Sequence, residues 1–390
     1  MAKRIIVFVG HFKPTIGGIE TYVDELFKRI AKKAVKVDIV TCYSGKINHF
    51  EHAKYFDIYR LSSWDLFGVY PIPKPTPRNF SLLFKLFRNK YSLVNTQIRF
   101  YPISFFGLFF AKLKGLPLIH TEHPSRHSVF SNKFIELCGK LYDHSFGTVL
   151  VKSANLNIGI SKPTCAFLRH IGAKNVTLIS NGVDTDSFNK KVYSPRNNKR
   201  FSADFKYITF VGRLIEAKGV QDLLIVFSEI LKKRPRIRLL VVGDGPYKKE
   251  LETLVKDKKI SNVLFLGKMN QNEIKDILNI TDIFVNPSYS EGLPTSVLEA
   301  GAMAVPIIAT TTGGTSEIID DGLNGFLISP KDRPNMSHYI LLLLKNEDIR
   351  KKFGFAIRIK IKRKFSWNTV SSRFYNCLTN LIDEYEKTNY

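Results

Sequence analysis

The sequence has few cysteines, no CxxC pair and no long apolar run. The longest apolar stretch, from Phe100 to Ala111, is interrupted by Pro102 and Gly107 and falls short of the ~20 residues that span a bilayer. A zinc site or a disulfide framework is not suggested, because the four cysteines are isolated from one another: Cys42, Cys138, Cys165 and Cys377. The sequence therefore predicts a folded protein with reduced thiols and no membrane-spanning segment.

Acidic side chains are also scarce, since 59 Lys and Arg face 34 Asp and Glu and the formal net charge is +25. A charge of that size attracts phosphates, nucleic acid or anionic lipid headgroups without choosing among them. Neither a helix-turn-helix pattern nor a sheet motif of aromatic and basic residues is evident, so no nucleic-acid partner is expected. No targeting segment is evident either: the apolar stretch Ile5 to Val9 is too short for a signal-peptide core. We expect a cytoplasmic protein.

What the chain does contain is an alternation of strand and helix patterns that runs through its length twice. With 390 residues it is long enough for two domains of about 150 to 200 residues, each able to bury a core. Strands that alternate with helices form parallel sheets. The predicted fold class is therefore α/β, with two Rossmann-like parallel-sheet domains facing across a cleft.

The stretch from Asn286 to Pro306, NPSYSEGLPTSVLEAGAMAVP, combines a tight loop with the start of a helix. It follows a short buried strand, and the N–H groups of the first helical turn lack intrahelical partners, which makes the loop a site for a phosphate. Two carboxylates, Glu291 and Glu299, flank the site. A phosphate site without a metal does not favour carboxylates as direct ligands, so they should face neutral, hydroxyl-rich parts of a ligand. This combination points to sugars.

The run SEGLPTSVLEAGA resembles the E-x7-E signature of the family-4 (group 1) retaining glycosyltransferases, which have the GT-B fold. The resemblance implies that Glu291 contacts hydroxyls of the donor sugar and that Glu299 contacts the ribose of the nucleotide. It also implies that the diphosphate is met by the backbone amides of Gly292, Leu293 and Pro294.

A second pattern in the same half of the chain, GRLIEAKG, carries two cations five residues apart. Arg213 and Lys218 would lie on a loop at the carboxyl edge of a sheet, where open α/β folds bind ligands. Such a pair can bracket a diphosphate and compensate the charge of the leaving group without a metal. The pattern matches the family's diphosphate-binding pair, and the resemblance also implies that backbone groups near Met269 contact the base.

In the first half, the pair Gly17 and Gly18 between a strand and a helix allows backbone conformations closed to other residues, and it resembles the family's GG loop near the donor phosphate and acceptor. The resemblance also implies that a histidine of HTEHPSRH lies over the donor sugar, with His123 the first choice and His120 the second; a core histidine is an equal alternative for His120. A metal is not expected, because alternation along a strand separates His123 from His120 and Glu122.

The resemblance covers nearly the whole chain. It implies an N-terminal acceptor domain over residues 1–188, joined by a C-terminal helix at about 366–390, and a nucleotide-sugar donor domain over 200–365. The polar run YSPRNNKR, which ends at Arg200, supports a boundary between them.

The expected activity is transfer of a glycosyl unit from a nucleoside-diphosphate sugar to an acceptor hydroxyl with retention, in the synthesis of a glycolipid, polysaccharide or other cell-surface glycan. No cofactor or metal is expected. A non-catalytic sugar-nucleotide-binding subunit is the alternative. The basic and aromatic stretches Phe80 to Lys90 and Phe105 to Lys114 suggest a lipid-linked or membrane-associated acceptor and peripheral contact with the anionic inner face of a membrane. For the helix over Phe80 to Asn89, a core-covering role is the alternative.

Overall fold

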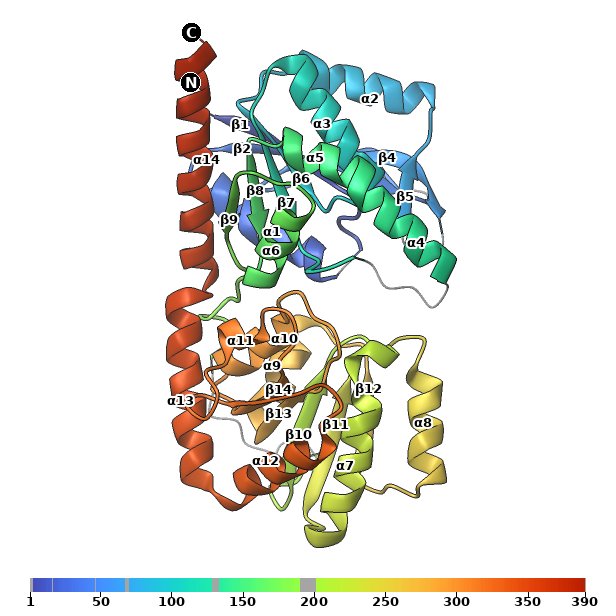
Figure 1. Ribbon diagram of the computed structural model, residues 1–390, viewed down its shortest axis with the longest axis vertical. Coiled ribbons are helices and arrows are strands. Elements are labelled where there is room, and N and C mark those ends of the chain that lie inside the picture. The colour runs from blue at the N-terminus through green and yellow to red at the C-terminus, as the bar shows by residue number, and fades with distance from the viewer. Residues whose placement is uncertain are drawn as a thin grey trace. The chain divides into compact units, whose positions relative to one another are not determined.

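The computed structural model describes residues 3–15, 17–45, 47–66, 70–127, 133–189 and 201–389, so the polar run YSPRNNKR lies outside the described residues. The chain forms two compact units (Figure 1). Unit 1 contains residues 1–181 and 367–390, and unit 2 contains residues 182–366. The division falls between Asn181 and Gly182, earlier than the expected end of the first domain at residue 188.

The strands of unit 1 form one sheet in the order β3-β4-β2-β1-β6-β7-β8-β9, with β5 paired to β4. All pairs from β4 through β2 to β9 are parallel, whereas β3 and β5 pair with β4 antiparallel. Buried apolar residues such as Ile6, Phe8 and Val94 form the core over the sheet. The bounds are β1 (Arg4–Val9), β2 (Lys36–Tyr43), β3 (Phe50–His52), β4 (Asp57–Leu66), β5 (Tyr70–Pro73), β6 (Leu93–Gln97), β7 (Leu118–Glu122), β8 (Leu156–Gly159) and β9 (Val176–Leu178).

Several helices of unit 1 begin where the sequence supplies a cap or a proline. The side-chain oxygens of Thr76 and Ser161 accept hydrogen bonds from first-turn amides, and α2, α3 and α6 each have proline in the first turn. The bounds are α1 (Gly18–Ala31), α2 (Pro77–Arg88), α3 (Pro102–Lys114), α4 (Lys133–Tyr142), the π-helical turn η1 (Asp143–Gly147), α5 (Thr148–Ser153), α6 (Lys162–His170) and α14 (Trp367–Asn389).

The proline-rich segment around residues 71–77 forms an edge strand and then starts a helix. Pro71 and Pro73 lie in β5, which is antiparallel to β4. Proline lacks the N–H group that a central strand must donate, so it is tolerated in an edge strand. Pro77 then starts α2, behind the cap at Thr76.

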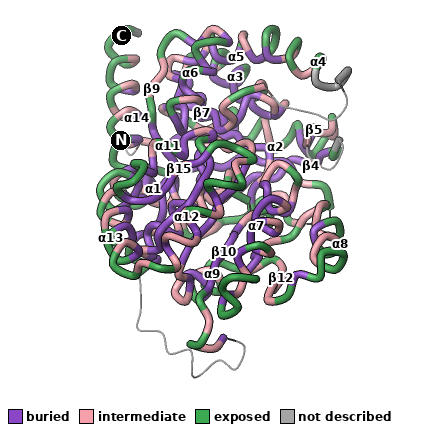
Figure 2. The backbone as a smooth tube through the Cα atoms, turned by 60° about the horizontal axis from the view of Figure 1, so that its bottom comes forward, coloured by how far each residue is buried: buried purple, intermediate pink, exposed green. Residues whose placement is uncertain are grey.

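Unit 2 has a parallel sheet in the order β12-β11-β10-β13-β14-β15. Its core gathers around Phe210, Phe227 and Val285. Figure 2 colours the central strands of the fold as buried and much of α8 as exposed. The bounds are β10 (Lys206–Val211), η3 (Glu216–Lys218), α7 (Val220–Lys233), β11 (Ile237–Val242), α8 (Lys248–Asp257), β12 (Val263–Gly267), α9 (Gln271–Ile280), β13 (Ile283–Asn286), α10 (Thr295–Ala302), β14 (Ile307–Thr310), α11 (Thr315–Ile318), β15 (Phe326–Ile328), α12 (Arg333–Lys345) and α13 (Glu347–Lys364).

After unit 2, the chain returns to unit 1 through α14. The ring of Phe374 lies edge-on to that of Phe27 in α1, with centroids 5.4 Å apart, so α14 is part of the packing of unit 1. Among the described residues, no helix combines the length and apolar character needed to cross a membrane.

Candidate active site

The carboxyl edge of the unit 2 sheet brings Lys218 and Glu291 together. Lys218 ends η3 after β10, and Glu291 lies after β13. Since β10 and β13 are neighbours at which the strand order reverses direction, their loops flank the topological switch point where open α/β sheets bind ligands. The Nζ atom of Lys218 is 2.7 Å from Oε1 of Glu291, and both side chains are largely buried. The Nδ2 atom of Asn286 lies 3.3 Å from the same oxygen.

Direct backbone contact holds these two loops against each other. The amide of Tyr289 donates to the carbonyl of Ala217 at 2.8 Å. Gly219 has φ of +68°, and a Cβ atom there would lie 2.1 Å from the carbonyl oxygen of Pro287. Glycine is therefore required next to Lys218 for both conformation and space.

A second glycine contact supports the segment Glu291 to Pro294 from the loop after β14. The amide of Gly314 donates to the carbonyl of Gly292 at 2.7 Å. A Cβ atom on Gly313, whose φ is +55°, would lie 2.2 Å from the carbonyl oxygen of Glu291. The sequence places Gly292, Leu293 and Pro294 between these contacts and the start of α10, with Leu293 and Pro294 buried.

Arg213 and Met269 lie on other loops at the same edge of the sheet. Arg213 is exposed on the loop after β10, and Met269 is half-buried after β12. The Arg213 loop is fixed by the amide of Leu214, which donates to the carbonyl of Asp244 at 2.9 Å. The structure thus brings Lys218 and Glu291 into contact. Arg213 and Met269 are associated with this site because their loops lie at the same edge of the sheet.

Glu299 lies in α10, the helix that begins after the site loop. Burial raises the pKa of its carboxyl to about 7, although part of the side chain remains exposed. A carboxyl with that pKa is divided between its two protonation states near neutral pH. It can therefore couple ligand binding to a proton.

His123 in unit 1 is buried and its ring is uncharged near neutral pH. Burial lowers the pKa of His123 to about 4. Its Nε2–H donates to Oε1 of Gln97 at 2.9 Å, and the ring meets Tyr22 edge-on at 4.9 Å. The imidazolium form of His123 is therefore disfavoured near neutral pH. With Nε2–H donated to Gln97, the neutral ring retains the lone pair of Nδ1, which can accept a hydrogen bond.

His120 is fully buried in β7 and makes contacts of a core histidine. Its Nδ1 lies 2.9 Å from Oγ1 of Thr96, and its Nε2 lies 3.4 Å from Oε2 of Glu122. His120 and Glu122 share one face of the strand, as alternation along a strand predicts. The ring of His123 contacts Gln97 and Tyr22, while its amide donates to Oε1 of Glu122 at 3.2 Å.

The glycine pair at the start of α1 does not have the backbone conformation that the sequence analysis expected. Gly17 is the N-cap with φ of −157°, an extended conformation open to any residue, and Gly18 begins the helix. Neither residue has the positive φ that was the stated reason for glycine. The pair lies at the carboxyl side of β1, with a Cβ on Gly17 placed 2.5 Å from Oε2 of Glu20.

A buried charge cluster near His123 was missed at the sequence level. Arg99 is fully buried, with its NH1 3.1 Å from Oε2 of Glu122 and its Nε 2.7 Å from Oδ1 of Asp143. Burial opposes ionisation of Glu122, but Arg99 and His120 outweigh it and lower the pKa of Glu122 to about 2. An arginine after one strand and an aspartate in a distant helical turn have no shared motif, so no sequence signal links them.

Comparisons with known proteins agree with this architecture. Residues 194–359 match the family described as glycosyl transferases group 1, and residues 16–187 match the family described as glycosyltransferase family 4. An uncharacterised glycosyltransferase of Methanocaldococcus jannaschii is 28% identical over 97% of this chain and 99% of its own length. The alpha-monoglucosyldiacylglycerol synthase of Acholeplasma laidlawii is 25% identical, with 86% of this chain and 87% of that protein covered.

Among solved structures, the sucrose-phosphate synthase of Thermosynechococcus elongatus superposes with a TM-score of 0.81 at 21% identity, covering 98% of this chain and all (100%) of that one. Such a likeness shows the fold. The two family matches cover successive parts of the chain, one mainly in each unit, and together they span most of it. The chain belongs to the group 1 glycosyltransferases and has their GT-B fold.

Proposed function

We propose that this glycosyltransferase transfers a sugar, with retention, from a nucleoside-diphosphate sugar to a hydroxyl of a lipid-linked or membrane-associated glycan, without a divalent metal. The observation that carries the proposal is the Lys218–Glu291 pair at the switch point of unit 2, with its nitrogen and oxygen 2.7 Å apart. One member suits a phosphate and the other suits sugar hydroxyls. In the unliganded protein the two satisfy each other.

The donor would replace this internal pairing. A diphosphate oxygen takes the Lys218 ammonium, and donor hydroxyls donate to Glu291, which keeps its contact with Asn286. In the transfer step the bond from the anomeric carbon to the diphosphate oxygen breaks, the acceptor oxygen bonds to that carbon on the same face, and the acceptor proton passes to the departing diphosphate. Lys218, Arg213 and the N–H groups of Gly292 and Leu293 stabilise the charge that develops there, whereas Pro294 has no N–H to donate. The lone pair of Nδ1 on neutral His123 would accept a hydrogen bond from a sugar hydroxyl.

Unit 1 supports a membrane-associated acceptor with an exposed aromatic surface, here named the aromatic face. Phe87 and Phe110 pack with ring centroids 5.2 Å apart, which joins α2 to α3. Phe105 and Phe146, 5.8 Å apart, join α3 to η1. The aromatic face consists of large exposed apolar side chains on α2, α3, η1 and the following helix α5: Phe80, Phe84, Phe87, Phe106, Phe109, Leu113, Phe146 and Val149.

Cations accompany the aromatic face. Lys85, Arg88 and Lys112 are exposed on the same two helices, α2 and α3. Apolar rings flanked by lysine and arginine are the composition of surfaces that lie in the interface of an anionic bilayer. The expectation that α2 only covers the core accounts for Leu86, which is fully buried, but not for Phe84, which is 66% exposed. A lipid surface is the occupant we propose.

Replacing Phe84 and Phe109 by serine should weaken binding to vesicles that contain anionic lipid. Each ring contributes on the order of 1.5 to 3 kcal/mol when fully buried, so about tenfold or more in affinity is expected per residue. Co-sedimentation measures the effect. The matched control is Phe355→Ser, because Phe355 is 67% exposed but lies on α13 of unit 2. Equal sedimentation of all these variants with the parent protein would disprove the aromatic face as the contact.

Glu299 should make donor affinity depend on pH. Its pKa of about 7 means that the carboxylate, which accepts from ribose hydroxyls, is lost as pH falls below 7. Affinity for a nucleotide sugar should therefore decline by at most about tenfold per pH unit below 7 and level off above it. Calorimetric titration of wild type and Glu299→Gln should show this dependence only in the wild type. Glu229→Gln, an exposed change on α7, should leave the profile unaltered.

The overall proposal is tested by a panel of nucleotide sugars in a chelator, with and without a membrane lipid extract, following release of the nucleoside diphosphate. Release that depends on the extract and on Lys218 and Glu291 supports metal-independent transfer to a lipid-linked acceptor. Donor binding without release in any combination would favour a non-catalytic subunit. Release that requires added Mg²⁺ would disprove the metal-free chemistry.

A further inference from the structure

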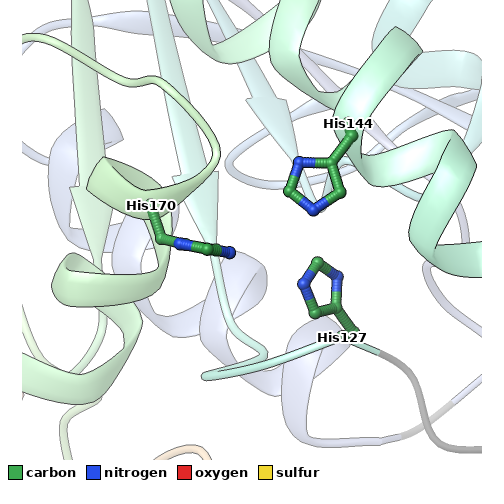
Figure 3. A group of neighbouring side chains, drawn as sticks. All are labelled: His127, His144 and His170. Carbon is green, nitrogen blue, oxygen red and sulfur yellow. The ribbon is translucent and has the colours of Figure 1, made fainter.

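Three histidines from separate elements meet in unit 1, whereas Lys218 and Glu291 belong to unit 2. His127 follows β7, His144 lies in η1 and His170 ends α6. Their ligand atoms all lie within 4.8 Å of one another. The ring centroids are 5.3 Å apart for His127 and His144, 5.9 Å for His127 and His170, and 5.6 Å for His144 and His170. Figure 3 shows the three rings directed towards one shared space.

A buried carboxylate fixes the orientation of one of these rings. Oδ2 of Asp143 is 2.6 Å from Nδ1 of His127, so Nδ1–H donates and the lone pair of Nε2 is left for a ligand. Asp143 is fully buried and is held through both of its oxygens by Arg99, at 2.7 and 3.1 Å. A carboxylate behind a histidine is the arrangement that orients histidine ligands in metal sites.

The π-helical turn η1 gives the cluster its shape. Asp143 and His144 are adjacent in the chain, yet Asp143 is buried against Arg99 while His144 is exposed. Single π-helical turns inside longer helices are frequent at functional sites. Here the turn presents one residue to the anchoring arginine and the next to the shared space of the histidines.

We propose that His127, His144 and His170 bind a divalent transition-metal ion, for which Zn²⁺ is the probe. Imidazole nitrogen suits Zn²⁺, Cu²⁺ and Ni²⁺, whereas Mg²⁺ prefers oxygen ligands. Three histidines leave the fourth tetrahedral position to water. Nitrogens bound at about 2.1 Å to a tetrahedral ion lie roughly 3.4 Å apart, so the rings must draw closer than in the empty cluster. His144 and His170 are exposed and can adjust their side-chain torsions.

Such an ion would link the segment after β7 to η1 and α6. Both of these elements are distant from that segment along the chain. Its ligands all belong to unit 1 and include none of the residues proposed to bind the donor, so it requires no change in the proposed metal-free transfer. From the sequence, no metal was expected in the chain, and strand alternation was applied to the stretch HTEHPSRH. His127 belongs to that stretch, but its two partners come from elsewhere.

The test is titration of the full-length, chelator-treated protein with Zn²⁺, monitored by competition with a chromophoric chelator. Wild type should bind one equivalent tightly, and His144→Ala and His170→Ala should each lose at least about tenfold in affinity. His338→Ala is the matched control, because His338 is exposed on α12 of unit 2 and should leave binding unchanged. Mg²⁺ should not compete.

Thermal unfolding gives a second measurement that does not involve activity. Both tryptophans of the chain, Trp64 and Trp367, lie in unit 1, so their fluorescence follows that unit. Zn²⁺ should raise the unfolding temperature of the wild type and of His338→Ala, and should have a smaller effect on His144→Ala and His170→Ala. The proposal would be overturned if the wild type bound no more Zn²⁺ than the double variant His144→Ala/His170→Ala, or if every variant bound Zn²⁺ equally.

Discussion

Replacing Lys218 by alanine is expected to lower the turnover of a saturating nucleotide sugar by about 10²- to 10³-fold, the loss typical when a preorganised charge is removed from a developing anion. The structure places the Lys218 ammonium at the switch point, with its partner Glu291 2.7 Å away. Rates of nucleoside-diphosphate release measure the effect. The matched control is Lys331→Ala, which removes the same charge from an exposed lysine that lies over the ring of Tyr289 in the same unit.

A second cause of lost activity must be separated from this one. Lys218→Ala also leaves the largely buried Glu291 without its cation. Displacement of the Glu291 loop would then lower the rate by itself, apart from any loss of charge stabilisation at the diphosphate. The double variant Lys218→Ala/Glu291→Gln also removes the negative charge of Glu291. If Lys218 stabilises the leaving group, the double variant stays as inactive as the single one. Recovery of the rate in the double variant would show that Lys218 only holds Glu291 in place.

The two loops that carry Lys218 and Glu291 were predictable because their signals are local. The proline and glycine residues around Glu291 lie within one short loop, and Lys218 ends another. Each loop follows a strand whose apolar run is evident. Parallel pairing then brings the carboxyl ends of β10 and β13 to one edge. The contact of Lys218 with Glu291 follows from two local patterns and one rule of topology.

The glycine contacts within this site could not be predicted with the same detail. Gly219 and Gly313 are required by carbonyl oxygens of other loops, at Pro287 and Glu291. A glycine in a sequence signals a turn, but not which distant backbone approaches it. At Gly17 the same reasoning led to the wrong cause, since the backbone there is extended.

Unit 1 was less predictable because its polar groups act over long sequence distances. Arg99, Asp143 and His127 form one continuous set of contacts, yet they come from three elements. The pKa of His123 depends on its burial, which the sequence around it does not encode. Strand alternation does place His120 and Glu122 on one face of β7, but His123 follows the end of that strand and its amide donates to Oε1 of Glu122.

Replacing the buried Arg99 by methionine is expected to destabilise unit 1 by about 3 to 5 kcal/mol, the cost of leaving a buried charge without its partner. Methionine retains much of the side-chain volume, but Glu122 and Asp143 lose their shared cation. Urea unfolding followed by the fluorescence of Trp64 and Trp367 reports on this unit. As a control, Lys351→Met breaks an exposed pair with Glu347 and should cause no measurable change.

The pH dependence of this loss distinguishes charge from packing. In the wild type the pKa of Glu122 is lowered to about 2, so its stabilising contribution is present above its unfolded value of about 4.3 and is lost as pH falls towards 2. Without Arg99, burial instead raises the pKa of Glu122, and the variant gains stability as the carboxyl is protonated. The difference between the two proteins should therefore shrink as pH falls from 7 to 4. Adding Glu122→Gln and Asp143→Asn to Arg99→Met should recover stability at pH 7, whereas a constant difference across pH would identify lost packing as the cause.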